Sequence, residues 1–272
     1  MATFAYKSFN SNNYAAFRPT YPAALFQKVL AFHRGGRALA LDVGCGNGQA
    51  TKPLAPNFQR VVGTDPSEGM VTAALEDGER QANVEYTVNS AEDLRFLGDR
   101  SVDLVVSGQA AHWFDHAAWF REMARILRPG GTLSFWGYAP HTYSGHPKAT
   151  EILLEYISGA DKFGPYWPEG RHHVASRYEH IHFPRGDFTD ELRVGDTSIH
   201  QTMPLGVDEK YVRTWSPVHQ LALEHRTTPR AEGGGGDMVD ELFDRLKASE
   251  TWTDESEVAV DFSIFLVLAR KI

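Results

Sequence analysis

Hydrophobic and polar residues follow two different periods along the first half of the chain. Short apolar runs, typical of buried strands, alternate with segments in which apolar residues recur at helical spacing. The predicted strands lie at 38–43, 60–65, 84–90, 102–110 and 132–138. Between them, Ser67 is placed to cap a helix over 67–81, and the sequence RPGG is expected to stop a helix over 116–127. Strands that alternate with helices in this way predict a parallel, doubly wound sheet.

The second half of the chain is less regular. Residues 140–190 combine one predicted helix with aromatic, proline-rich loops, which indicates an insertion lying over a site. Further strands are predicted at 197–206 and 257–271, and further helices at 207–225, with Pro217 as a point of interruption, and at 237–249. We therefore expect an α/β fold with a mostly parallel seven-stranded sheet, an antiparallel last strand and a cap insertion.

Composition narrows the class of protein. The 272 residues are 42% hydrophobic, enough for a substantial core, and the net charge of −8 disfavours a nucleic-acid or anionic-membrane partner. The single cysteine, Cys45, excludes an intrachain disulfide and fits a reducing compartment. The N-terminus has no apolar core of signal-peptide length, and the longest apolar stretch is too short to span a bilayer. The sequence therefore predicts a soluble, cytoplasmic protein, which we expect to be a monomer.

A glycine-rich turn follows the first predicted strand. Asp42 is followed by Gly44, Gly46 and Gly48. Such a turn suits a ligand that approaches the backbone so closely that a Cβ would collide with it. The spacing is not the G-x-G-x-x-G of dinucleotide folds, and no Lys-Ser or Lys-Thr pair makes a P-loop. Asp65 ends the second strand, where a carboxylate can accept both hydroxyls of a ribose. The pattern favours an adenosine-ligand site over a set of tight turns with no ligand.

Four segments resemble the successive motifs of class I S-adenosylmethionine-dependent methyltransferases: "LDVGCGNG", "GTDPSEGM", "NSAEDL" and "LRPGGTL", over roughly 38–137. The resemblance implies a Rossmann-like fold, S-adenosyl-L-methionine as cofactor and S-adenosyl-L-homocysteine as product. It implies that the turn from Asp42 through Gly44 and Gly46 to Gly48 borders the methionine part of the cofactor and that Asp65 holds the ribose. It also implies that Pro66 and Met70 flank the adenine, with Ser90, Ala91 and Glu92 at the adenine edge. Gln109 and Ala110 would line the sulfonium side.

Segments outside this core are similar to the fungal trans-aconitate methyltransferases: "FNSNNYAAFRPTYP", "AHWFD", "WGY", "GPYWPEGR" and "YVRTWSPVHQ". The likeness implies that the chain esterifies a carboxylate of a small polycarboxylic acid, with trans-aconitate as the best single guess. It implies one methyltransferase domain over 1–272, made of an N-terminal lid (1–37), a cofactor-binding core (38–139), a cap insertion (140–190) and C-terminal strands and helices (191–272). In the lid, Tyr14 and Arg18 would close on the cofactor and Tyr21 on the substrate; an ordinary helical arm is the alternative.

Methylation of a carboxylate needs positioning more than proton transfer. The acceptor is already ionised at neutral pH, so no general base is required, and arginine is the residue that binds its other carboxylates with paired hydrogen bonds. Arg18, Arg171, Arg177 and Arg213 are candidates, against the alternative that each is a surface residue. Arg171 and Arg213 are the first choice for substrate binding, because each lies among aromatic residues.

His112 follows the fourth strand, where ligands bind in such sheets, and is the candidate catalytic residue. It could act as a base on a phenol or amine, orient a carboxylate, or only pack beside Trp113. Trp113, Trp136 and Tyr138 are expected to wall the substrate side, with core packing as the alternative.

Two other functions stay open at this point: a natural-product O- or N-methyltransferase acting on a phenol or amine, and a cofactor-binding domain without methyl transfer. The histidines of "RHHVASRYEHIH" lack the spacing of a zinc site, so we expect no metal. Cys45 has no base nearby in the sequence and is not expected to be a nucleophile. The expected partner is a small-molecule acid.

Overall fold

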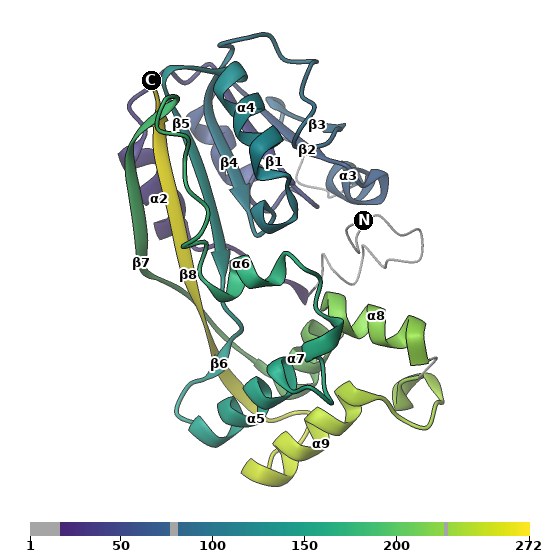
Figure 1. The fold of residues 1–272 in the computed structure, drawn as a ribbon. Helices are drawn as coiled ribbons and strands as arrows, with labels where there is room; N and C mark the ends of the chain where they lie inside the picture. Colours follow the sequence, from purple (N-terminus) through teal and green to yellow (C-terminus); the bar gives the residue numbers. More distant parts are fainter. Residues whose placement is uncertain (1–16, 77–80, 226–227) are drawn as a thin grey trace. The chain divides into compact units, whose positions relative to one another are not determined.

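A computed structural model describes residues 17–76, 81–225 and 228–272, without the side chain of His225 (Figure 1). Their contacts divide into two compact units. The sheet unit consists of Thr20–Ala139, His172–Ser198 and Ser263–Ile272. The helical unit consists of 17–19, Pro140–Arg171 and Ile199–Phe262. The segment 140–190, predicted as one cap insertion, thus contributes residues to both units.

The sheet unit contains the predicted parallel sheet. Its parallel strands are β1 (Leu39–Val43), β2 (Arg60–Asp65), β3 (Val84–Val88), β4 (Val102–Gly108) and β5 (Leu127–Tyr138), in the order β3-β2-β1-β4-β5. The last strand, β8 (Glu257–Lys271), runs antiparallel to β5, and β7 (Phe188–Pro204) pairs with β8. The expected fold class is therefore confirmed.

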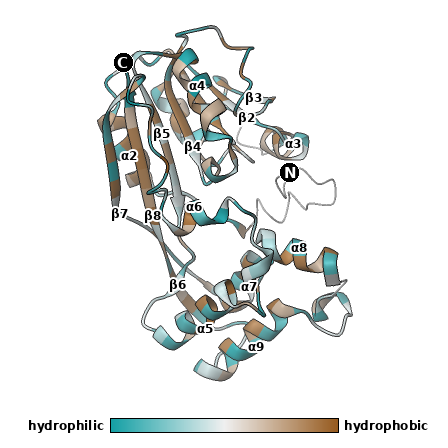
Figure 2. Ribbon diagram, viewed as in Figure 1, coloured by the Kyte–Doolittle hydropathy of each residue, from teal (hydrophilic) through white to brown (hydrophobic). Residues whose placement is uncertain are grey.

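Helices cover both faces of this sheet (Figure 1): α2 (Ala23–Phe32), α3 (Glu68–Glu76) and α4 (His116–Ile126). Successive side chains of a strand point to opposite faces. On β5, Trp136 packs edge-on against Phe26 of α2, with ring centroids 5.9 Å apart, whereas Phe135 packs against Trp119 of α4 at 5.4 Å. Strands buried on both sides need continuous apolar runs, which is why β4 and β8 are predominantly brown in Figure 2.

The start of β5 differs from the prediction. Helix α4 ends at Ile126, and the sequence RPGG at 128–131, expected to stop a helix, already belongs to β5. The pairing with β4 shifts in register between Val102 and Leu104, and Gly130 has a φ of 79°. Glycine in this left-handed region lets the strand pass through the irregularity. The same residues that end many helices therefore lie at an irregularity in the pairing of β4 with β5.

The helical unit packs its helices against one another. It contains α5 (Pro147–Ser158), η4 (Gly164–Tyr166), α7 (Leu205–Val212), α8 (Ser216–His225), η5 (Arg230–Glu232) and α9 (Met238–Glu250), and both α5 and α7 contact α9. The predicted helix over 207–225 is divided into α7 and α8 at the expected place, because Pro217 is tolerated only in a first turn.

One strand in this unit was not predicted. The two-residue β6 (Thr142–Tyr143) pairs antiparallel with β8 and brings the sheet to eight strands in the described part of the chain. Two residues are too few to show the alternation of apolar and polar positions by which a strand is predicted. Across the described ranges no helix is long and apolar enough to cross a membrane.

Candidate cofactor and acceptor site

The glycine turn is built by backbone contacts between β1 and β2. The Gly44 N–H donates to Thr64 O at 2.8 Å, and the Gly46 N–H donates to Asp65 Oδ2 at 3.0 Å. Gly44 has a φ of 69°, and a Cβ on it would lie 2.5 Å from the Cβ of Ala110. Gly46 has a φ of 54°, and a Cβ there would meet nothing within 4 Å. The turn therefore needs glycine for its backbone and keeps one face clear at Gly46, as a ligand lying against the main chain requires.

Asp65 is the carboxylate that the turn positions. Its Oδ2 accepts the Gly46 N–H and its Oδ1 accepts the Ser67 N–H at 2.9 Å. Burial raises the pKa of Asp65, while these two backbone hydrogen bonds act in the opposite direction. Each oxygen keeps acceptor capacity beyond its one amide, so the carboxylate can still accept two hydroxyl groups. The donor and acceptor set at the ends of β1 and β2 thus fits the ribose of an adenosyl cofactor.

Asp42 has a different environment from its neighbour. It is fully buried, and Thr51 Oγ1 donates to its Oδ2 at 2.6 Å. Burial raises the pKa of Asp42 to about 7, the Thr51 hydrogen bond opposes this, and the charge of Asp65 adds to it. The segment after the turn continues into η2 (Lys52–Asn57), so the contact with Thr51 anchors the start of that segment to β1. Asp42 was predicted at the methionine part, and its supporting partner Thr51 was not predicted.

The residues predicted around the adenine lie after β2 and β3. Ser67 Oγ accepts the Met70 N–H at 3.4 Å, which confirms the predicted cap of α3. Met70 is buried and Pro66 is exposed. After β3, Ser90 and Glu92 are half-buried and Ala91 is buried, and Glu92 Oε1 accepts the Asp115 N–H at 3.0 Å.

Strand β4 is followed by a residue with unusual backbone geometry. Gln109 has a φ of 53°, and for a residue other than glycine this conformation is costly. Its N–H donates to Trp136 O at 2.7 Å, and its Oε1 accepts the Tyr138 N–H at 2.8 Å. The side chain thereby extends the pairing with β5 by one residue. The next residue, Ala110, is the one whose Cβ lies so close to Gly44 that a Cβ there would collide with it. The ends of β1, β4 and β5 are therefore packed closely together.

His112 lies on η3 (Ala111–Trp113), directly after this point. Its Nδ1 is 3.0 Å from the hydroxyl oxygen of Tyr178, and its ring centroid is 5.0 Å from that of Trp113. Tyr178 is fully buried and comes from the loop after α6 (Arg171–Ala175). Tyr178 was not predicted among the site residues.

Two residues of the predicted aromatic wall, Trp136 and Tyr138, cluster with Tyr21 within the sheet unit, whereas Trp113 packs beside His112. Tyr21 packs edge-on against Trp136 at a centroid distance of 5.4 Å and lies 6.5 Å from Tyr138. Trp136 and Tyr138 are both buried. The structure thus brings these three residues together, and Trp136 also packs against Phe26 of α2.

Two of the arginines predicted for the lid and the cap, Arg18 and Arg171, lie in the helical unit. Arg18 donates from Nη2 to Thr214 O at 3.0 Å, and its guanidinium lies 5.4 Å from the centroid of Tyr211. The guanidinium of Arg171 lies 4.7 Å from the centroid of Trp167. Tyr14 is outside the described residues. Arg177, in the sheet unit, has a φ of 52°.

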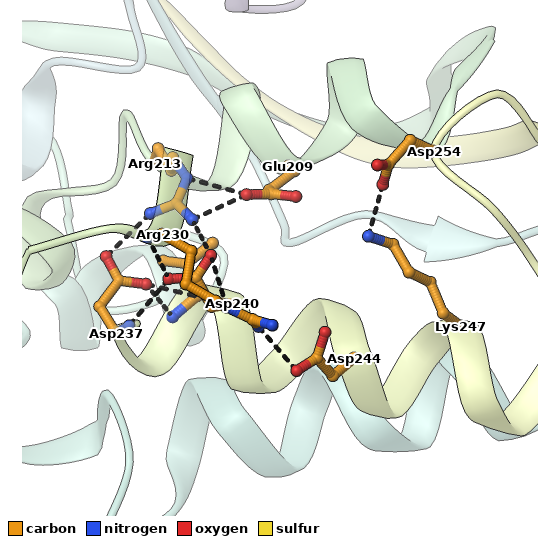
Figure 3. A network of polar contacts seen from close by, with 9 residues as sticks. Glu209, Arg213, Arg230, Asp237, Asp240, Asp244, Lys247 and Asp254 are labelled. Carbon is orange, nitrogen blue, oxygen red and sulfur yellow. Dashed lines mark hydrogen bonds and ion pairs between the residues drawn. The ribbon is translucent and has the colours of Figure 1, made fainter. Parts of the chain in front are cut away.

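Arg213 is surrounded by carboxylates of its own unit (Figure 3). Its guanidinium donates to Glu209 at 2.7 and 3.0 Å, to Asp237 at 2.8 Å and to Asp240 at 2.9 Å. Asp237 and Asp240 belong to the capping box of α9, so Arg213 ties α7 to the start of α9. They also line a cavity of about 710 Å³ with further acidic residues, Asp161, Glu241 and Asp244. These surroundings argue against binding a substrate carboxylate, because like charges repel.

Comparisons with known proteins show the family of this chain. A sequence profile described as a methyltransferase domain matches residues 41–135. CRG1 of Saccharomyces cerevisiae, described as a probable S-adenosylmethionine-dependent methyltransferase, is 34% identical over 175 residues, which are 63% of this chain and 60% of that protein. A Dictyostelium discoideum protein classed as a methyltransferase is 30% identical over 265 residues, 96% of this chain and 93% of that protein.

A solved structure agrees as well. A protein from Anaeromyxobacter dehalogenans described as a type II methyltransferase has a TM-score of 0.73 and 32% identity, over 93% of this chain and 98% of that one. The chain belongs to the S-adenosylmethionine-dependent methyltransferases, and its cofactor is S-adenosyl-L-methionine. In the described ranges no group of three or more His, Cys, Asp or Glu side chains is arranged to hold a metal ion.

We expect Gly46→Ala to weaken binding of S-adenosyl-L-homocysteine roughly tenfold, because the added Cβ would occupy the face of the turn that is otherwise clear and would disfavour its left-handed backbone by about 1–2 kcal/mol. Gly98→Ala is the matched control: a Cβ at Gly98 also meets nothing within 4 Å, and its φ is not in the left-handed region. Titration calorimetry measures both affinities. Equal affinities of the two variants would contradict the role given to Gly46.

We expect Asp42→Asn to change the pH dependence of stability. The pKa of Asp42 rises from 3.8 to about 7 on folding. Between these values the folded state holds a proton that the unfolded state has released, so the free energy of unfolding falls as pH rises from about 4 to 7, by about 1.4 kcal/mol per unit. Denaturant unfolding at several pH values should show this loss in the wild type relative to the variant. Parallel pH profiles for the two proteins would show that Asp42 titrates normally.

Proposed function

We propose that the protein transfers the methyl group of S-adenosyl-L-methionine to a carboxylate of a small polycarboxylic acid, with trans-aconitate as the best single candidate. The observation that carries the proposal is the pair of arginines held against aromatic rings, Arg18 over Tyr211 and Arg171 over Trp167. A guanidinium kept against a ring loses less rotational freedom when its N–H groups bind a carboxylate in a paired geometry.

The reaction places few chemical demands on the protein. The cofactor supplies a methyl group on a positively charged sulfur, which an acceptor oxygen takes by in-line displacement to give a methyl ester and S-adenosyl-L-homocysteine. No proton is released when the acceptor is an ionised carboxylate. The work of the chain is then to hold the ribose at Asp65, to keep the turn at Gly46 clear, and to orient the acid through its remaining carboxylates.

A phenol or amine is the competing class of acceptor, and His112 is the observation that favours it. Such acceptors lose a proton on methylation, and the imidazole of His112, after β4, is a side chain that can act as a general base. Carboxylate acceptors need no such base, so the two classes predict different products from one assay.

The assay uses S-adenosyl-L-methionine with a labelled methyl group and a panel of di- and tricarboxylic acids, phenols and amines. We expect label in the acids, with trans-aconitate among the best acceptors, and we expect alkali to release it because the product is an ester. Label only in phenols or amines would contradict the proposal. Label in no compound, with S-adenosyl-L-homocysteine still bound, would favour a cofactor-binding domain without transfer.

Arginine variants in the same assay identify the acceptor contacts. Arg171→Ala and Arg18→Ala should each raise the KM for the acid about ten- to a hundredfold, the size of one hydrogen bond between charged groups. Arg245→Ala is the control, since Arg245 pairs with Glu155 in the same unit and lies 42% exposed. An unchanged KM in both test variants would remove these arginines from the acceptor site.

A further inference from the structure

The loop that carries Tyr178 has a strained backbone. Arg177 and Tyr178 are consecutive residues other than glycine with φ values of 52° and 61°. This left-handed conformation is unfavourable for a residue that carries a Cβ. Two in succession persist only where the surroundings hold them in place.

Arg193 of β7 supplies much of that support. Its Nη1 donates to Tyr178 O at 2.8 Å and its Nη2 donates to Ile181 O at 2.6 Å, so one guanidinium bridges two carbonyls of the loop. The Tyr178 N–H in turn donates to His173 O at 2.8 Å. Glu191 pairs with Arg193 at 2.7 Å and helps to fix it. The backbone of Tyr178 is thus bound on both its N–H and its C=O side.

With this backbone conformation, the ring of Tyr178 packs in the core of the sheet unit. Its ring centroid lies 4.9 Å from that of Phe265 on β8 and 5.6 Å from that of Phe135 on β5. A phenylalanine would serve such packing equally well, and a buried hydroxyl is costly unless it is hydrogen-bonded. The hydroxyl oxygen is 3.0 Å from Nδ1 of His112, which lies on η3, after the end of β4.

We propose that Tyr178 is a positioning residue: its hydroxyl donates to Nδ1 of His112 and fixes the neutral ring as the tautomer with the proton on Nε2. The direction follows from the chemistry of the pair, because a phenol is the stronger acid and an imidazole nitrogen the stronger base. His112 then presents an N–H donor at Nε2. That polarity suits an acceptor carboxylate and does not suit removal of a proton from a phenol or amine, so the inference rests on the proposed function and deepens it.

The tautomer is measured first on the wild-type protein, and this measurement does not depend on any variant. Histidine labelled with ¹⁵N is incorporated, and the two ring nitrogens of His112 are observed at about pH 8, above the usual imidazole pKa. Loss of the signals in His112→Gln assigns them. We expect a protonated Nε2 and an unprotonated Nδ1 in the presence of S-adenosyl-L-homocysteine. A protonated Nδ1 would overturn the proposal.

Tyr178→Phe then removes the hydroxyl and keeps the ring. We expect the two tautomers of His112 to mix and kcat for the acid to fall roughly tenfold, the size of one hydrogen bond, with an unchanged affinity for S-adenosyl-L-homocysteine. Tyr156→Phe is the control, because it removes a tyrosine hydroxyl that donates to Glu241 in the helical unit, and it should leave both readouts unchanged. An unaltered tautomer in Tyr178→Phe would overturn the proposal, as would an equal loss of kcat in both variants.

Failure of this inference can be told apart from failure of the proposed function. If no acid is methylated but His112 has the Nε2–H tautomer and loses it in Tyr178→Phe, the proposed substrate class is wrong and the role of Tyr178 in fixing the ring stands. If acids are methylated and His112 has a protonated Nδ1, the proposed function stands and the role of Tyr178 is wrong.

Discussion

The carboxylate of Asp65, held between the amides of Gly46 and Ser67, is the interaction on which the site depends. It requires Gly46 to take a left-handed backbone, which only a residue without a Cβ adopts at little cost. It also requires the ends of β1 and β2 to lie side by side, and the parallel register of Val43 with Thr64 provides this. One acid at a strand end thus joins the turn, the second strand and the residue before α3 by hydrogen bonds.

Two buried or half-buried carboxylates lie close to one another here, and their environments separate their roles. Asp42 has only Thr51 as a donor in the described contacts of its side chain, so burial dominates and raises its pKa to about 7. Asp65 has two backbone donors that oppose the effect of burial on its pKa. Asp65 therefore receives two backbone donors that favour its ionised form, whereas Asp42 receives the hydroxyl of Thr51 and supports the turn.

Periodicity and glycine spacing were sufficient to predict the sheet, the turn and the place of Asp65 at the end of the second strand, because these features are local in sequence. Other features depend on distant residues. Tyr178 contacts His112 across 66 positions, and no local pattern marks that pairing. Arg213 has aromatic sequence neighbours that resemble a carboxylate site, but two of its three acidic partners are Asp237 and Asp240, which only the packing of α7 on α9 brings to it. The glycines at the start of β5 carry a signal shared by helix ends and bulges, so sequence alone could not distinguish them.

The central claim is that Asp65 binds the cofactor's ribose from the glycine turn. Calorimetric titration of S-adenosyl-L-homocysteine into the wild type and Asp65→Ala tests it most directly, with Asp93→Ala, an exposed acid of the same unit paired with Arg95, as control. We predict binding to the wild type and the control, and an affinity lower by at least about thirtyfold in Asp65→Ala, since two hydrogen bonds to a charged group are lost. An Asp65→Ala protein that is folded and binds as tightly as the wild type would contradict the account.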